Sequence, residues 1–208
     1  MKRLVYIALL VVLVLGGVYV YLHRQDLGLV ASTTSGSDQA TPDQSSSVYH
    51  PARIAWQPID RTPDGFKVDM PGDVKQIQIP AYNEQGGADQ VNMIYVYPDA
   101  QTSFSVAWAD NPPVMRASGR SPQLTLDTAR DDALGRTQTT LVSESRTNIN
   151  NLPAREFSAR NVGGGVMNCR LIDDGQRLYM LIAAFPASSA RRDDDVQHFF
   201  DSFTILNP

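Results

Sequence analysis

A hairpin in the last third of the chain places the tightest constraint on its fold. Two runs of alternating apolar residues, 165–172 and 176–185, are separated by Asp173, Asp174 and Gly175. An Asp-Gly pair tolerates the positive φ angles of a two-residue type I′ turn, which matches the twist of the flanking strands. The sequence therefore predicts an antiparallel hairpin with Asp174 and Gly175 as its loop.

This loop predicts a register that puts apolar side chains on one face of the hairpin. The expected opposite pairs are Leu171 with Leu178, Cys169 with Met180, and Met167 with Ile182. Such a face forms one wall of a core. Cys169 is the only cysteine, so we expect a small buried apolar residue there, and an intermolecular disulfide is the alternative.

The rest of the domain alternates strand and helix patterns. Further strands are expected at 54–58, 66–70, 74–79, 90–97, 102–109, 140–146, 154–160 and, as a short edge strand, 204–206. Residues 66–70 and 74–79 are expected to form a hairpin. A helix is expected from Thr125 to about Gly135, with Asp127 in its first turn. A second helix, capped by Ser188 or Ser189, is expected after Pro186, with a buried stripe of Val196, Phe199, Phe200 and Phe203.

Apolar residues on both sides of one strand indicate how these elements pack. Val91 and Met93 face one way, whereas Ile94 and Val96 face the other. Two apolar faces require cover on both sides. The fold class expected from this pattern is α+β, with a mostly antiparallel sheet flanked by helices in an α/β/α sandwich.

The N-terminal part indicates a membrane anchor before the domain. Residues 4–22 carry no charge, and a helix of this length is about 28 Å long, which is enough to cross a bilayer. The preceding residues 1–3 hold two positive charges, so they are expected to stay in the cytoplasm. Residues 23–48 form a Ser/Thr-rich flexible tether, and residues 49–208 form the globular domain. A cleaved secretory signal is the alternative.

Charge and motifs exclude several classes of function. The net charge of −4 disfavours a nucleic-acid or anionic-lipid surface, because both require a positive field. Asp194 and His198 are four residues apart and can face one another, but two ligands do not close a metal site. The acidic run 193–195 fits the first turn of a helix. No sequence motif predicts a catalytic residue, a metal site, a cofactor or a small-molecule ligand.

Four motifs in order resemble the bacterial single-domain relatives of PsbP. They are residues 65–72 (GFKVDMPG), 151–157 (NLPAREF), 175–181 (GQRLYML) and 199–203 (FFDSF). The resemblance implies the Mog/PsbP-type α/β/α sandwich and a non-catalytic domain that binds or helps to assemble something. PsbP itself supports calcium and chloride retention in the oxygen-evolving complex, and no ion-binding residue set carries over to this chain.

One long irregular segment is the candidate binding element. Residues 110–123 contain three prolines and a glycine and join a strand to a helix. Long loops of this kind often carry binding residues. The candidates around it are Trp108, Asp110, Arg116 and Arg120, and the alternative is a plain connection with solvated arginines.

The function expected from these features is a binding or assembly module outside the cytoplasm. Its anchor would make it a single-pass protein of a bacterial inner membrane, with the C-terminal domain in the periplasm. The expected partner is an envelope or membrane protein. The alternative is an envelope enzyme, for example a hydrolase, whose active site is assembled from residues distant in sequence.

Overall fold

The structure is a computed structural model that describes residues 55–82, 88–99, 102–113, 119–187 and 193–206. The predicted anchor and tether therefore lie outside the described residues, as does the start of the predicted domain. Within the described residues, no helix has the length and apolar character needed to cross a membrane.

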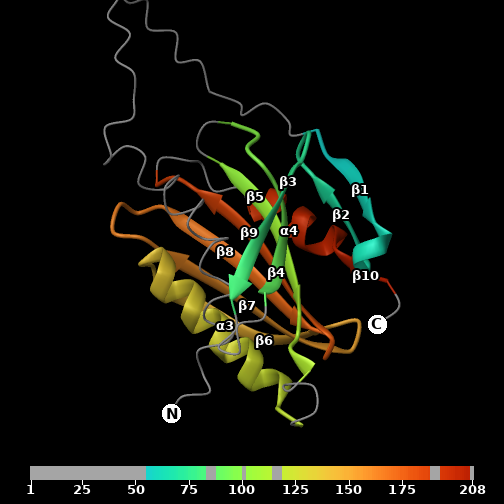
Figure 1. The fold of residues 1–208 in the computed structure, drawn as a ribbon. Helices are drawn as coiled ribbons and strands as arrows, with labels where there is room; N and C mark the ends of the chain where they lie inside the picture. Colours follow the sequence, from blue (N-terminus) through green and yellow to red (C-terminus); the bar gives the residue numbers. More distant parts are fainter. Residues whose placement is uncertain (1–54, 83–87, 100–101, 114–118, 188–192, 207–208) are drawn as a thin grey trace, which may run out of the picture.

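Seven antiparallel strands form the main sheet, in the order β3-β4-β5-β9-β8-β7-β6 (Figure 1). The strands are β3 (Lys75–Tyr82), β4 (Ala88–Val96), β5 (Ser103–Asp110), β6 (Thr140–Ile149), β7 (Leu152–Arg160), β8 (Val166–Asp173) and β9 (Arg177–Phe185). Every two strands that pair in this sheet are consecutive in sequence, except β5 and β9. Between these two, the chain runs through α3 and strands β6, β7 and β8. The mostly antiparallel sheet expected from the short connections is confirmed.

A smaller sheet contradicts one sequence prediction. It has the order β1-β2-β10, with β1 (Gln57–Arg61), β2 (Phe66–Met70) and β10 (Thr204–Ile205). The predicted hairpin between 66–70 and 74–79 is wrong, because β2 pairs with β1 and β10 whereas β3 pairs with β4. Gly72, at φ +113°, lies where the chain passes from one sheet to the other.

Two α-helices pack on opposite faces of the main sheet. They are α3 (Pro122–Thr137) and α4 (Asp193–Ser202). α3 begins three residues earlier than predicted because Ser121 has an extended conformation and Pro122 occupies the first helical position. Asp127 is therefore not in the first turn. In α4 the first turn is acidic, as predicted, and the expected caps Ser188 and Ser189 lie outside the described residues.

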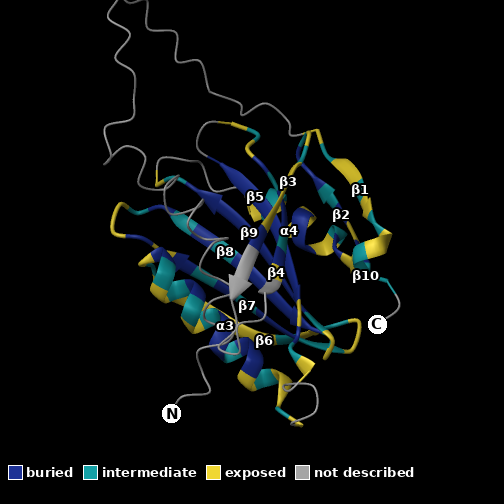
Figure 2. Cartoon of the chain, in the orientation of Figure 1, coloured by how far each residue is buried: buried dark blue, intermediate teal, exposed yellow. Residues whose placement is uncertain are grey.

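The two faces hold separate cores, and each core includes one helix. The central strands β5 and β9 are buried over almost their whole length (Figure 2). The α3-face core includes Leu126, Ala129 and Ala133 of α3. The α4-face core includes Phe199, Phe200 and Phe203, together with Phe66, Val68 and Met70 of β2. The predicted two-sided cover and the predicted phenylalanine stripe are confirmed.

The β8–β9 hairpin has the predicted apolar face but a different register. Leu171 lies opposite Met180 rather than Leu178, and Cys169 lies opposite Ile182 rather than Met180. The Asp174 N–H donates to the Arg177 main-chain oxygen at 3.1 Å, so the loop consists of Gly175 and Gln176. Gly175, the first loop residue, takes the positive φ of +85°. A shift by an even number of residues keeps every side chain on its face.

Cys169 is buried, as predicted, in the α3-face core. Burial raises the pKa of its thiol far above the ordinary value. A thiol that stays protonated is a poor nucleophile, so the folded protein keeps this group unreactive.

Candidate functional site

Trp108, the first of the predicted binding residues, is part of the core. Only 2% of it is exposed, and its indole Nε1–H donates to Asp64 Oδ1 at 3.2 Å. The guanidinium of Arg61 lies 5.3 Å from the centre of the same ring. Arg61 also pairs with Asp64 at 2.5 Å. These contacts fix the turn between β1 and β2 against the main sheet.

Asp110 lies near Trp108, at the end of β5. Its Oδ1 accepts a hydrogen bond from Arg177 Nε at 2.7 Å, and Arg177 also donates to the main-chain oxygen of Asp64. Together these contacts join the small sheet to the ends of β5 and β9. Trp108 and Asp110 thus contribute to the junction of the two sheets, and their role in binding stays a prediction.

Arg120 lies two residues before the start of α3. Its Nη2 donates to Thr128 Oγ1 at 3.0 Å and to the main-chain oxygen of Leu124. Burial lowers the pKa of its guanidinium, and the nearby carboxylate of Asp173 acts in the opposite direction. Arg116 lies outside the described residues. Arg120 thus bonds to residues of α3, whereas Trp108 and Asp110 bond to the β1–β2 turn and to β9.

Asp173 is a buried carboxyl that contacts the start of this segment. The sequence alone predicts it only as part of a turn. Asp173 is 3% exposed and accepts hydrogen bonds from Asn111 Nδ2 and the Gly175 amide, each at 2.9 Å. Burial raises the pKa of Asp173 above its ordinary value. These bonds tie the start of the loop to the β8–β9 hairpin, which gives Asp173 a structural role.

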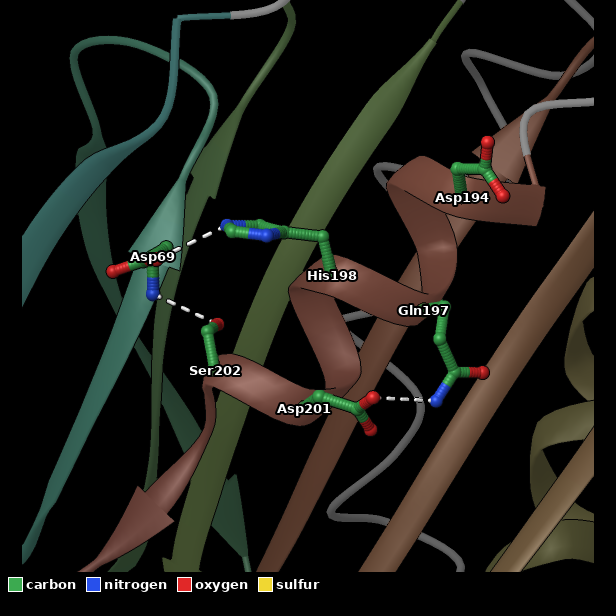
Figure 3. Close-up of a pocket in the computed structure, with 6 residues that line it drawn as sticks. All are labelled: Asp69, Asp194, Gln197, His198, Asp201 and Ser202. Atoms are coloured by element: carbon green, nitrogen blue, oxygen red, sulfur yellow. Dashed lines mark hydrogen bonds and ion pairs between the residues drawn. The ribbon is translucent and has the colours of Figure 1, made fainter.

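An open pocket of about 450 Å³ lies between β2 and α4 (Figure 3). Its lining residues are Asp69, Asp194, Gln197, His198, Asp201 and Ser202. Asp69 comes from the polar side of β2, whereas the other five lie on α4. No local motif joins these residues, which is why the sequence did not predict the pocket.

Asp69 holds α4 to β2 at the pocket. Its Oδ2 lies 3.0 Å from His198 Nε2, and its main-chain N–H donates to Ser202 Oγ at 3.0 Å (Figure 3). The sequence had suggested that His198 faces Asp194, and the structure shows it paired with Asp69 instead. The imidazole also lies against Trp56, with 4.5 Å between ring centres.

The pocket is chemically an acidic hydrogen-bonding surface. Its three carboxylates, Asp69, Asp194 and Asp201, favour a cationic group. Of these three, Asp201 pairs with Arg170, at 3.4 Å. Ser202 donates its hydroxyl proton to the main-chain oxygen of Phe199 at 2.8 Å, so this proton is not directed at a base. No group of three or more metal-ligating side chains lies close enough to hold a metal ion in the described part of the chain.

Comparison with known proteins gives similarity at the level of the fold. The sequence matches no family model and no curated protein. The solution structure of cyanobacterial PsbP (CyanoP) from Synechocystis sp. PCC 6803 aligns with a TM-score of 0.50 and 13% identity, over 75% of this chain and 95% of that one. A protein of unknown function from Pseudomonas aeruginosa aligns with a TM-score of 0.39 and 10% identity, over 74% and 98%. The described domain has a PsbP-like fold, as the sequence motifs indicated.

Proposed function

We propose that this chain is a membrane-anchored, extracytoplasmic PsbP-like module that binds or assembles an envelope or membrane protein. The observation that carries the proposal is the pocket between β2 and α4. Its histidine and serine are engaged in holding α4 to β2, while its open surface presents carboxylates. Such an acidic surface suits the binding of cationic groups, which requires no bond cleavage.

The pocket chemistry suggests which group of the partner binds. Asp194, Gln197 and His198 are exposed, and three carboxylates surround the opening. A lysine or arginine side chain would gain charge-assisted hydrogen bonds there. A basic segment of the partner is therefore the group that fits best.

The hydrolase alternative finds little support in this geometry. Nucleophilic catalysis needs a base hydrogen-bonded to the nucleophile. Here His198 Nε2 faces Asp69, and the Ser202 hydroxyl bonds within its own helix. Binding therefore accounts for the arrangement better than acyl transfer does.

Crosslinking and purification from membranes test the binding role. The full chain carrying Asp194→Lys and Gln197→Lys should lose the partner that the unchanged chain retains, because one of the three carboxylates is lost and two positive charges are added beside the other two. Asp131→Lys, an exposed charge reversal on α3, is the matched control and should retain the partner. Retention of every partner by the pocket variant would contradict the assignment of the pocket.

Two further experiments test the role of the loop and the cellular location of the protein. Replacing both Arg116 and Arg120 by Ala should weaken the same co-purification if the segment 110–123 borders the partner. Cell fractionation with external protease should find the chain in the membrane and its domain accessible from outside the cytoplasm. Full-length protein in the cytosolic fraction would contradict the proposed anchor.

A further inference from the structure

The two edges of the main sheet differ in how they resist pairing with another strand. β3, at one edge, contains Lys75 and Pro80, and proline leaves a strand one N–H donor short. β6, at the other edge, is ten residues long and contains neither lysine nor proline. Its seven residues from 140 to 146 are all exposed. Of the two edges of the main sheet, β6 is therefore the one more open to pairing.

The β6–β7 turn determines which main-chain groups point outward. Asn150 and Asn151 both have positive φ, so the pair Ile149–Leu152 closes a two-residue hairpin. In such a hairpin the closing pair and every second pair after it exchange their main-chain hydrogen bonds. The remaining residues of β6, among them Glu144 and Arg146, consequently direct their N–H and C=O groups away from β7.

The exposure of Glu144 agrees with this geometry. The residue is exposed as a whole, although only 23% of its side chain is, because Arg130 and Arg155 cover the carboxylate. Its main chain therefore contributes much of the exposed surface. The neighbouring Arg146 has 66% of its side chain exposed, and its contact with Asp127 is long, at 3.8 Å.

We infer that two copies of this chain pair through β6, antiparallel, with Ser145 of each copy opposite Ser145 of the other. This register places Glu144 opposite Arg146 twice, once on each side of the twofold axis. Opposite charges across a strand pair are favourable, whereas like charges are unfavourable. Sliding one copy by two residues, the smallest shift that keeps the hydrogen-bonding pattern, puts Glu144 opposite Glu144 or Arg146 opposite Arg146. The charges therefore favour a single register.

The positions of the helices permit this pairing. α3 packs on β7 and β8, and both copies of α3 lie on the same side of the joined sheet. With about 4.8 Å between strands, the two helices are about 19 Å apart, compared with the 8–10 Å of helices in contact. The bulge between Leu141 and Ser143 lies at the end of the paired segment, where it limits further growth of the sheet.

Cysteine crosslinking of the full chain in detergent micelles tests the register. Ser145→Cys places two thiols opposite each other at a non-hydrogen-bonded pair, where the Cα atoms are about 4.5 Å apart. The native Cys169 is buried and does not compete. Thr147→Cys is the matched control, because Thr147 lies on the same side of β6 but opposite Ser143 of the other copy. We expect disulfide-linked dimer to form at least tenfold faster with Ser145→Cys than with Thr147→Cys.

A charge variant then tests why that register forms. Adding Arg146→Glu to Ser145→Cys puts Glu144 opposite a second carboxylate, and the rate of dimer formation should fall at least tenfold. Arg146→Gln should give an intermediate rate. An unreactive Cys169 verifies that each variant is folded. Equal rates for Ser145→Cys and Thr147→Cys, no dimer at all, a rate unchanged by Arg146→Glu, or crosslinks only to a different protein would each overturn the proposal.

Discussion

The two faces of the main sheet are built from different kinds of side chain. The α3-face core consists of aliphatic, small and sulfur-containing residues, and Phe157 is its one aromatic residue among those described as buried. The α4-face core is aromatic. Its buried rings are Phe66, Phe104, Trp108, Tyr179, Phe185, Phe199, Phe200 and Phe203. The same sheet thus contacts one helix through aliphatic and small side chains and the other through edge-to-face and tilted rings.

Each face also buries one arginine that contacts its helix. Arg155, on β7, is fully buried on the α3 face and contacts Asp127 and Gln123 of that helix, as well as Glu144. Arg170, on β8, is 5% exposed, donates to the main-chain oxygen of Phe200, and has its guanidinium 4.8 Å from the Phe200 ring centre. The comparison indicates that α3 depends more on charge, and α4 more on apolar burial.

The largest expected effect comes from removing a ring of the α4 face. Phe199→Ala should lower the free energy of unfolding by about 3–5 kcal/mol, because it leaves a cavity and removes the edge contact with Phe104 at 5.3 Å. Leu126→Ala on the α3 face should cost less, about 2–3 kcal/mol. Urea denaturation measures both. An equal or larger loss for Leu126→Ala would remove the proposed difference, and Phe199→Leu serves if the alanine variant does not fold.

The two buried arginines provide the next test. Arg155→Met should cost about 2–4 kcal/mol, because the carboxylates of Asp127 and Glu144 lose a cation in a site where they are only 30% and 23% exposed. Arg170→Met should cost about 1–2 kcal/mol, because its carboxylate partners are more exposed. Arg146→Met, at an exposed site, is the control. Equal losses at the two buried positions would contradict a greater role of charge on the α3 face.

Much of this two-faced fold could be predicted from local patterns. The alternation of Val91 and Met93 with Ile94 and Val96 required cover on both sides of the sheet, and the phenylalanine stripe in α4 marked its buried side. The hairpin register depended on which residue took the positive φ. Gly175 could occupy either loop position, so sequence alone could not distinguish the two registers.

The candidate sites were much harder to predict, because they depend on contacts between distant segments. Asp69 and His198 are 129 positions apart, and the alternation of β2 marks Asp69 only as a polar residue. Trp108 is a candidate binding residue because it precedes a long loop, and nothing in the sequence indicates that its indole bonds to Asp64 in the first turn of the domain. A single sequence carries no signal for such pairings. For the same reason, the sequence did not predict that β2 belongs to a separate sheet.

Glu144 should make part of the stability on the α3 face sensitive to acid. Burial raises the pKa of Glu144, but hydrogen bonds and charge from Arg130 and Arg155 outweigh it and hold the pKa below its ordinary value. Such a carboxyl stabilises the fold above its unfolded-state pKa, near pH 4.3, and this stability is lost as pH falls through the lower folded-state value.

Glu144→Gln should therefore reduce the free energy of unfolding at pH 7 by about 1 kcal/mol or less and flatten its decrease below about pH 5. Urea denaturation at a series of pH values measures this slope. Glu156→Gln, the matching change beside Arg170 on the α4 face, is the control and should cost less at pH 7, because 35% of the Glu156 side chain is exposed, compared with 23% of that of Glu144. An unchanged slope in Glu144→Gln would place the acid sensitivity elsewhere.

The smallest expected effect concerns the urea midpoints of the two faces, which should be equal. Cys169 reports on the α3 face through its reactivity towards a thiol reagent, and Trp108 and Trp56 report on the α4 face through fluorescence. Because one sheet supplies a wall to both cores, the faces should open together, and both probes should give the same urea midpoint. A thiol that reacts at lower urea than the fluorescence change would mean that α3 detaches first. Since α3 depends more on charge than α4 does, added salt should then widen the gap between the two midpoints.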